Sequence, residues 1–215
     1  MLIVCAGVML FCASQQAIAD DDSAVSSRMN TAFGPTGLIT VPTAYVTPKG
    51  EAQIGAFFGR DSDSASVNYG LISGLEVGAA YLSSSDDEII ANVKANIIPS
   101  NWDRVQIGVG LMDVLDQVED TFYAIVSTDL LAPPSALEDD ATFLRLHVGY
   151  GAGAFDDEII GGAELFLNSK WAVLAEWNGD ELGAAIRYCH DTPFRAQAGM
   201  YDERFFASMT VGLEF

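Results

Sequence analysis

The chain has 215 residues, with 30 acidic and 10 basic side chains and a formal net charge of -20 at pH 7. Its hydrophobic fraction of 50% is too high for a disordered acidic chain, and its negative charge would repel nucleic acid. The length suits one domain, or at most two small ones. Two of the three cysteines, Cys5 and Cys12, lie near the start, which excludes a disulfide framework and a structural zinc site.

The first residues have the shape of a secretory signal. An apolar and small run, MLIVCAGVMLFCA, is followed by Ala17-Ile18-Ala19 before the first charge, Asp20, and the run is too short to span a bilayer. We therefore expect a signal peptide over residues 1–19, cleaved after about Ala19, and an exported protein. The alternatives are an uncleaved anchor and a lipoprotein modified at Cys12, for which the neighbouring Phe11 makes a poor recognition site.

From residue 51 onward the dominant hydrophobic period is 2, which is typical of strands. The segment Ile89-Ala91-Val93-Ala95-Ile97, for example, alternates with Ile90, Asn92, Lys94 and Asn96. The pattern and the turn residues between its segments predict an all-β chain of about twelve antiparallel strands and no helix. The expected strands are 52–59, 66–72, 75–82, 89–98, 104–112, 121–130, 143–150, 160–168, 171–177, 182–189, 194–201 and 205–215.

Many short alternating strands fit either a soluble sandwich or barrel, or an up-and-down transmembrane β-barrel of the outer membrane. The polar face favours the membrane barrel, because its acids and bases nearly balance, as a crowded interior requires. We expect the following polar side chains to line the lumen, with Glu214 adding a further acid: Glu76, Lys94, Arg145, His147, Glu164, Glu176, Arg187 and Arg195. Glu176 and Arg187 flank the Asn178-Gly179 turn, so we predict that they form an ion pair.

Aromatic residues and acids are sorted by strand end, which also favours the membrane barrel. The two expected aromatic girdles are Phe58, Tyr81, Tyr150, Trp177 and Tyr201 at one end, and Trp102, Trp171, Tyr188, Phe194 and Phe215 at the other. More than half of the acids fall in alternate connections, which are external if the first strand runs outward. These acids are Asp61, Asp63, Asp86, Asp87, Glu88, Asp113, Asp116, Glu119, Asp120, Asp156, Asp157, Glu158, Asp180, Glu181, Asp202 and Glu203. An alternating last strand that ends in Phe215 resembles the signal that directs bacterial outer-membrane barrels to assembly.

Residues 20–50 precede the barrel, which we expect to cover residues 51–215. Pro35 and Pro42 cannot donate ladder hydrogen bonds, so the segment between them is a poor central strand. It could be a short edge strand, a periplasmic cap or a plug tucked into the lumen. A structural role in closing the periplasmic mouth is favoured over ligand binding.

Three segments resemble the YjbH-type outer-membrane proteins. They are Gly34-Pro35-Thr36-Gly37-Leu38-Ile39-Thr40-Val41-Pro42-Thr43-Ala44, then Asn68-Tyr69-Gly70-Leu71 with Leu75-Glu76-Val77-Gly78, and Ala175-Glu176-Trp177-Asn178-Gly179 with Leu182 to Tyr188. The resemblance covers roughly residues 34–215 and implies a short, single-module outer-membrane barrel. Larger relatives are linked to exopolysaccharide production.

Catalytic and metal-binding patterns are weak. Neither His147 nor His190 has an obvious serine partner, so the protein is not expected to be an enzyme. The acids of two similar loops could bind Ca²⁺ or Mg²⁺ weakly, but no calcium-loop spacing is present and a solvated acidic rim is favoured. These acids are Asp86, Asp87, Glu88, Asp156, Asp157 and Glu158. No other cofactor is expected.

We therefore expect a bacterial outer-membrane barrel with a structural or transport-associated role, in or beside envelope exopolysaccharide export. The alternatives are a small nonspecific porin and, less favoured, a membrane-embedded hydrolase. The expected partners are outer-membrane lipid and lipopolysaccharide, the barrel-assembly machinery through Phe215, and polysaccharide export components.

Overall fold

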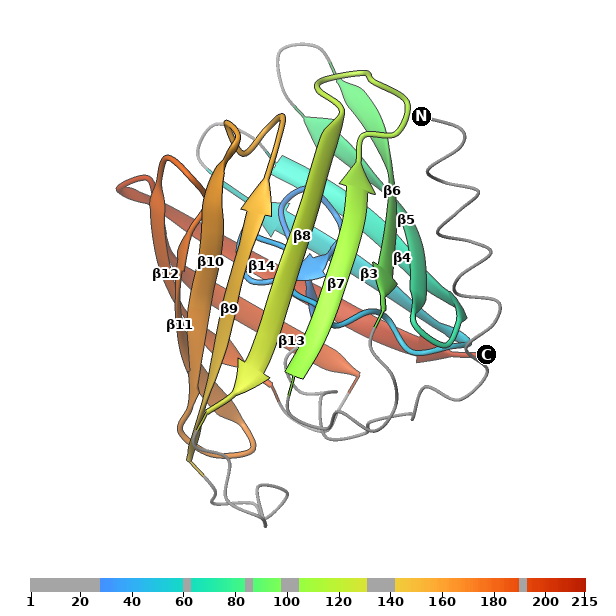
Figure 1. The fold of residues 1–215 in the computed structure, drawn as a ribbon. Coiled ribbons are helices and arrows are strands. Elements are labelled where there is room, and N and C mark those ends of the chain that lie inside the picture. The colour runs from blue at the N-terminus through green and yellow to red at the C-terminus, as the bar shows by residue number, and fades with distance from the viewer. Residues whose placement is uncertain (1–27, 60–62, 84–86, 98–104, 131–141, 190–192) are drawn as a thin grey trace.

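Twelve strands form one closed antiparallel barrel in the computed structural model (Figure 1). The structure describes residues 28–59, 63–83, 87–97, 105–130, 142–189 and 193–215. The predicted signal peptide, residues 1–19, lies outside these ranges. In the described residues no helix is long and apolar enough to cross a membrane.

Each barrel strand pairs with the next along the chain, and the last strand closes on the first. The strands are β3 (Glu51–Phe58), β4 (Asp63–Ile72), β5 (Leu75–Ser83), β6 (Glu88–Asn96), β7 (Val105–Met112), β8 (Thr121–Asp129), β9 (Phe143–Gly151), β10 (Glu158–Phe166), β11 (Trp171–Trp177), β12 (Leu182–Tyr188), β13 (Phe194–Tyr201) and β14 (Arg204–Glu214). β14 pairs antiparallel with β3 over the register from Ala207↔Phe58 to Glu214↔Glu51. The predicted up-and-down, twelve-stranded topology is confirmed.

The strand boundaries shift by a few residues from those expected, because pairing extends past the alternating core of a strand. β4 begins at Asp63 rather than at 66, since Asp63 pairs with both Phe58 and Ser83. β10 likewise begins at Glu158, which pairs with Gly151.

The barrel is apolar outside and polar inside, the reverse of a soluble protein. Val148 on β9 is 59% exposed and Ile186 on β12 is 56% exposed. The buried side chains include the polar set Gln53, Asn68, Asn92, Lys94, Ser127, Arg145, His147, Glu164, Glu176, Arg187, Gln197 and Thr210. In a soluble sandwich these would face water, whereas an apolar outer wall is stable against lipid. The chain therefore forms a transmembrane β-barrel.

The expected aromatic girdles are present on the outer face in most described positions. Phe58, Tyr81, Tyr150 and Trp177 are exposed at one end, and Trp171, Phe194 and Phe215 at the other. Tyr201 departs from the expectation: its register places it inward, where its hydroxyl accepts a hydrogen bond from Asn178 Nδ2 at 2.6 Å. Trp102 lies outside the described residues.

We call the end reached by β3, β5, β7, β9, β11 and β13 the acidic end. Its tight turns explain part of its composition, because Asp tolerates the left-handed backbone better than most residues. Asp202 and Glu203, which link β13 to β14, have φ of 48° and 58°, and Asp156 and Asp157 have φ of 55° and 59°.

Candidate functional site: a filled lumen

Residues 28–47, which we call the plug, lie inside the barrel (Figure 1). They form a two-stranded sheet of β1 (Met29–Asn30) and β2 (Thr36–Gly37), followed by a tight turn in which Leu38 N–H donates to Val41 O at 2.9 Å. The side chains of Leu38, Ile39 and Val41 are fully buried. Of the three placements considered for this segment, the structure has it within the lumen.

Glycines allow the plug to fold tightly and to lie close to the wall. A Cβ at Gly37 would lie 2.4 Å from Val41 O, so the plug turn needs glycine there. On the wall, a Cβ at Gly108 of β7 would lie 2.7 Å from the Cα of Ala44. A side chain at either position would collide with the plug backbone.

Glu176, on β11, binds the backbone of the plug turn. Its Oε2 accepts N–H groups of Ile39 at 2.8 Å and Val41 at 3.3 Å. Its Oε1 accepts the N–H and the hydroxyl of Thr40 at 2.9 and 2.8 Å. This carboxylate therefore satisfies three main-chain donors that a tight turn would otherwise leave buried and unpaired.

Glu76, on β5, holds two other parts of the plug in the same way. It accepts the N–H of Thr36 at 3.0 Å and the N–H of Thr47 at 2.7 Å, together with both threonine hydroxyls. Lys94 is directly opposite Glu76 in the β5–β6 register and donates to Thr36 O. The Glu76 carboxylate thus accepts the N–H of Thr36, and the Lys94 ammonium group donates to the C=O of the same residue.

Arg187, on β12, contacts plug carbonyls and a buried acid together. It donates to Gly37 O and Leu38 O, each at 3.1 Å, and its Nη1 lies 2.6 Å from Glu164 Oε1. Both side chains of this ion pair are fully buried. The pair is therefore compensated locally, as a buried charge must be.

His147 links Glu164 to the plug through Ser127. Ser127 Oγ lies 2.7 Å from His147 Nδ1, and His147 Nε2 lies 3.2 Å from Glu164 Oε2. Ser127 Oγ also accepts the N–H of Ala44 at 3.0 Å, which connects the imidazole to the plug backbone. The expectation that His147 has no serine partner was wrong, because Ser127 lies directly opposite it in the β8–β9 register.

This Ser-His-Glu chain differs from a hydrolase triad. In a triad the serine faces Nε2 and the acid faces Nδ1, and the hydroxyl is open to substrate. Here the nitrogens are exchanged, and Ser127 is fully buried beneath the plug. The arrangement fits docking of the Ala44 backbone rather than acyl transfer.

The remaining predicted bases also meet plug groups. Arg145 forms an ion pair with Asp129, Nε to Oδ1 at 2.6 Å, and its guanidinium lies 4.5 Å from the ring centre of plug residue Tyr45. Arg195 donates to Arg28 O at 3.1 Å. All eight predicted lumen residues are thus buried inside the barrel, with exposed fractions of 0–3%.

The predicted Glu176–Arg187 ion pair was wrong. Glu176 is opposite Gly183, and Arg187 is opposite Ala172, four positions further along β12. At about 3.3 Å per residue the two positions are about 13 Å apart along the strand, too far for contact. Glu214 is exposed rather than part of the interior.

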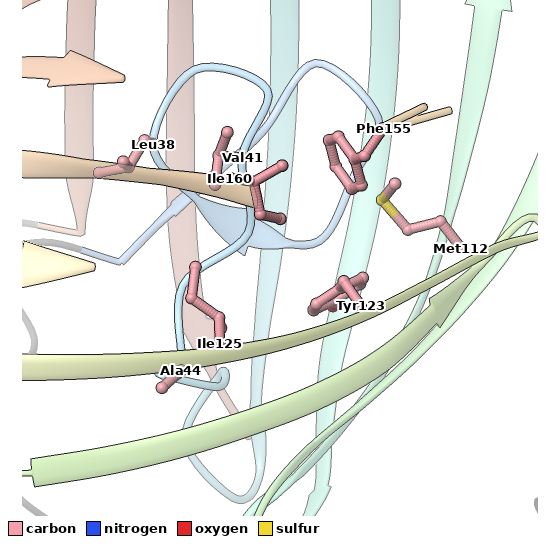
Figure 2. Close-up of a cluster of buried hydrophobic side chains, with 8 residues drawn as sticks. All are labelled: Leu38, Val41, Ala44, Met112, Tyr123, Ile125, Phe155 and Ile160. Carbon is pink, nitrogen blue, oxygen red and sulfur yellow. The ribbon is translucent and has the colours of Figure 1, made fainter. Parts of the chain in front are cut away.

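An apolar cluster also packs the plug against the barrel wall (Figure 2). Leu38, Val41 and Ala44 of the plug lie against side chains from the barrel wall and from the loop after β9. The wall and loop members are Met112, Tyr123, Ile125, Phe155 and Ile160. The plug is therefore held both by polar bonds to its backbone and by burial of its apolar side chains.

The acidic loops hold no assembled metal centre in the part of the chain described: no three His, Cys, Asp or Glu side chains are placed to share an ion. Asp87, Glu88, Asp156, Asp157 and Glu158 lie at the acidic end, and Tyr150 Oη donates to Asp157 at 3.2 Å. Asp86 is outside the described residues.

Sequence reasoning missed Ser127, Asp129 and, above all, the partners of the charged residues. Ser127 and Asp129 share the inward register of β8, a strand whose two faces are not cleanly different in polarity. The lumen charges bind main-chain groups of the plug. Every residue type carries these groups, so such partners cannot be predicted from residue identities.

The fold and the filled lumen together define a small transmembrane β-barrel with an internal plug. No known protein family and no curated protein matches the sequence. Among solved structures the chain is similar to the KdgM porin, with a TM-score of 0.52 at 9% identity over 77% of this chain and 99% of that one. A KdgM porin complex with disordered oligogalacturonate gives the same values. This likeness supports the twelve-stranded barrel fold.

Proposed function

We propose that the protein is an outer-membrane channel of the porin type, which its own N-terminal plug keeps closed in the conformation described. The observation that carries the proposal is the set of bonds from lumen side chains to the plug backbone. Glu76, Glu176, Lys94 and Arg187 all bind main-chain groups of residues 36–47. These bonds hold the plug in the lumen, where it fills the path that a solute would take through the barrel.

The outer-membrane location rests on the apolar outer wall, the aromatic ends of the strands and the signal-like first residues. The barrel-assembly machinery is the proposed partner in assembly, through the alternating strand β14 and Phe215. Lipid and lipopolysaccharide are the proposed contacts of the outer wall.

The oligogalacturonate bound by the structural neighbour is a poor candidate permeant for this chain. Oligogalacturonate is a chain of uronates and therefore a polyanion, whereas the loops at the acidic end would repel an anion by their summed field. We propose small cations or neutral solutes as the permeants of the open form.

The YjbH-type resemblance supports a second candidate, a role beside exopolysaccharide export. Its most specific part, residues 34–44, forms the plug turn that Glu176 holds. A shared role would therefore act through the plug. Deleting residues 34–44 in the cell should then change exopolysaccharide yield, while a channel role alone predicts no change.

Solute efflux from proteoliposomes tests the channel proposal. The native protein should release small solutes slowly, and the Glu76→Gln/Glu176→Gln protein should release them at least about tenfold faster, because the plug loses its two charged acceptors. Glu158→Gln, an exposed acid at the acidic end, is the matched control and should behave as the native protein. Fast efflux through the native protein would contradict closure.

A further inference from the structure

The acidic end contains a pocket that the plug and the barrel wall build together. It encloses about 200 Å³, and its lining includes Phe33 and Thr40 of the plug and Phe57 and Phe206 of the wall. The volume is below the roughly 300–1,000 Å³ of pockets for drug-sized ligands, so its occupant is about one ring with a short side chain.

The floor of the pocket is apolar and aromatic. The rings of Phe57 and Phe206 stack with centres 5.2 Å apart and planes at 14°. Both are nearly buried, and they pack against plug residue Ile39. Aromatic faces attract cations as well as apolar groups, because the ring quadrupole is negative above the plane.

The rim of the pocket is negative. Glu181 and Asp202 line it together with Arg204, whose Nε lies 3.6 Å from Asp202 Oδ2. The Arg204 charge thus offsets that of Asp202. With the Glu181 carboxylate, the three side chains together carry one net negative charge. The exposed acids Asp156 and Asp157 of the loop after β9 and Glu158 at the start of β10 add to the negative field at this end.

We propose that this pocket binds a small organic cation that has an apolar or aromatic body and an ammonium group. The body would lie against Phe57 and Phe206, and the ammonium group would face Glu181. The same negative field would repel an anionic ligand of the same shape. The proposal does not require that the plug moves.

Binding of three probes of matched shape tests this proposal in the full-length protein in nanodiscs, with empty nanodiscs as the blank for partitioning. 2-Phenylethylammonium should bind saturably, about tenfold more tightly than neutral 2-phenylethanol, and its affinity should fall with added salt. 3-Phenylpropanoate should not bind. No saturable binding of the ammonium probe, or equal binding of the anion, would overturn the proposal.

Two variants assign the binding to this pocket. Glu181→Gln should weaken the ammonium probe several-fold, while Asp180→Asn, the adjacent acid outside the pocket lining, should leave it unchanged. Phe57→Leu keeps apolar bulk but removes one ring from beneath the body that both probes share, and should weaken the ammonium probe and 2-phenylethanol by similar factors. Equal effects of Glu181→Gln and Asp180→Asn would show that the ammonium group binds elsewhere.

Discussion

Glu176 on the barrel wall accepts the backbone N–H of Ile39 in the plug at 2.8 Å, and this contact joins residues that are 137 positions apart in sequence. The same carboxylate binds the two following N–H groups, so one side chain fixes the conformation of the whole plug turn. An acceptor of this kind depends on its charge, because charged hydrogen bonds are shorter and stronger than neutral ones.

Replacing Glu176 with Gln should therefore loosen the plug turn. Loss of the charged acceptor should cost about 1.5–3 kcal/mol of docking free energy, the usual value of a bond to a charged group. Hydrogen–deuterium exchange at the amides of residues 39–41 should speed up by at least about tenfold. Exchange of β14 amides is the internal control and should not change; equal acceleration there would mean that the whole barrel had been destabilised.

The buried Glu164–Arg187 pair should show strong energetic coupling. Either single change, Glu164→Gln or Arg187→Gln, should lower the free energy of unfolding by about 3–5 kcal/mol, because the remaining charge stays buried without its partner. The double variant should lose less than the sum of the two. Urea unfolding from lipid vesicles measures all four corners of the cycle.

The exposed Asp202–Arg204 pair is the matched comparison for that cycle. Its side chains are 41% and 48% exposed, so water screens the interaction. Its coupling energy should be about 0–1 kcal/mol. Coupling of the Glu164–Arg187 pair no larger than this would show that the two buried side chains do not meet.

The outer wall should reject charge only where it contacts lipid. Val148 in the middle of β9 and Leu115 in the loop after β7 are each 59% exposed, which makes them a matched pair. Val148→Arg should cost about 2–4 kcal/mol and reduce the folded fraction, whereas Leu115→Arg should assemble normally. Equal assembly of the two variants, measured by heat-modifiable migration, would argue against a lipid-facing wall at β9.

Gly108 should control the fit of the plug without any change of charge. A leucine there would occupy the space of the Ala44 backbone, so Gly108→Leu should displace the plug and raise solute efflux. Val109→Leu, at the next position on β7 but on the outer face, should leave efflux unchanged. Unchanged efflux in Gly108→Leu would show that the wall tolerates a side chain at this point.

Sequence reasoning reached the strands and the inward residues because both depend on local alternation. Lys94 and Arg145 are inward simply because they fall on the same register as their polar neighbours. The partner of Glu176 could not be predicted from the sequence, because it is a run of backbone amides and every sequence has those. The pairing of Glu176 with Arg187 failed for a related reason: flanking the same turn does not place two residues opposite each other.

The single-channel conductance of a protein that lacks residues 28–47 tests the central claim most directly. If the plug closes the lumen, the native protein should show little current in a planar bilayer, and the folded deletion variant should show stable open channels. Heat-modifiable migration of the same sample establishes that the barrel has folded. Equal conductance of the two folded proteins would contradict closure of the lumen by its N-terminal segment.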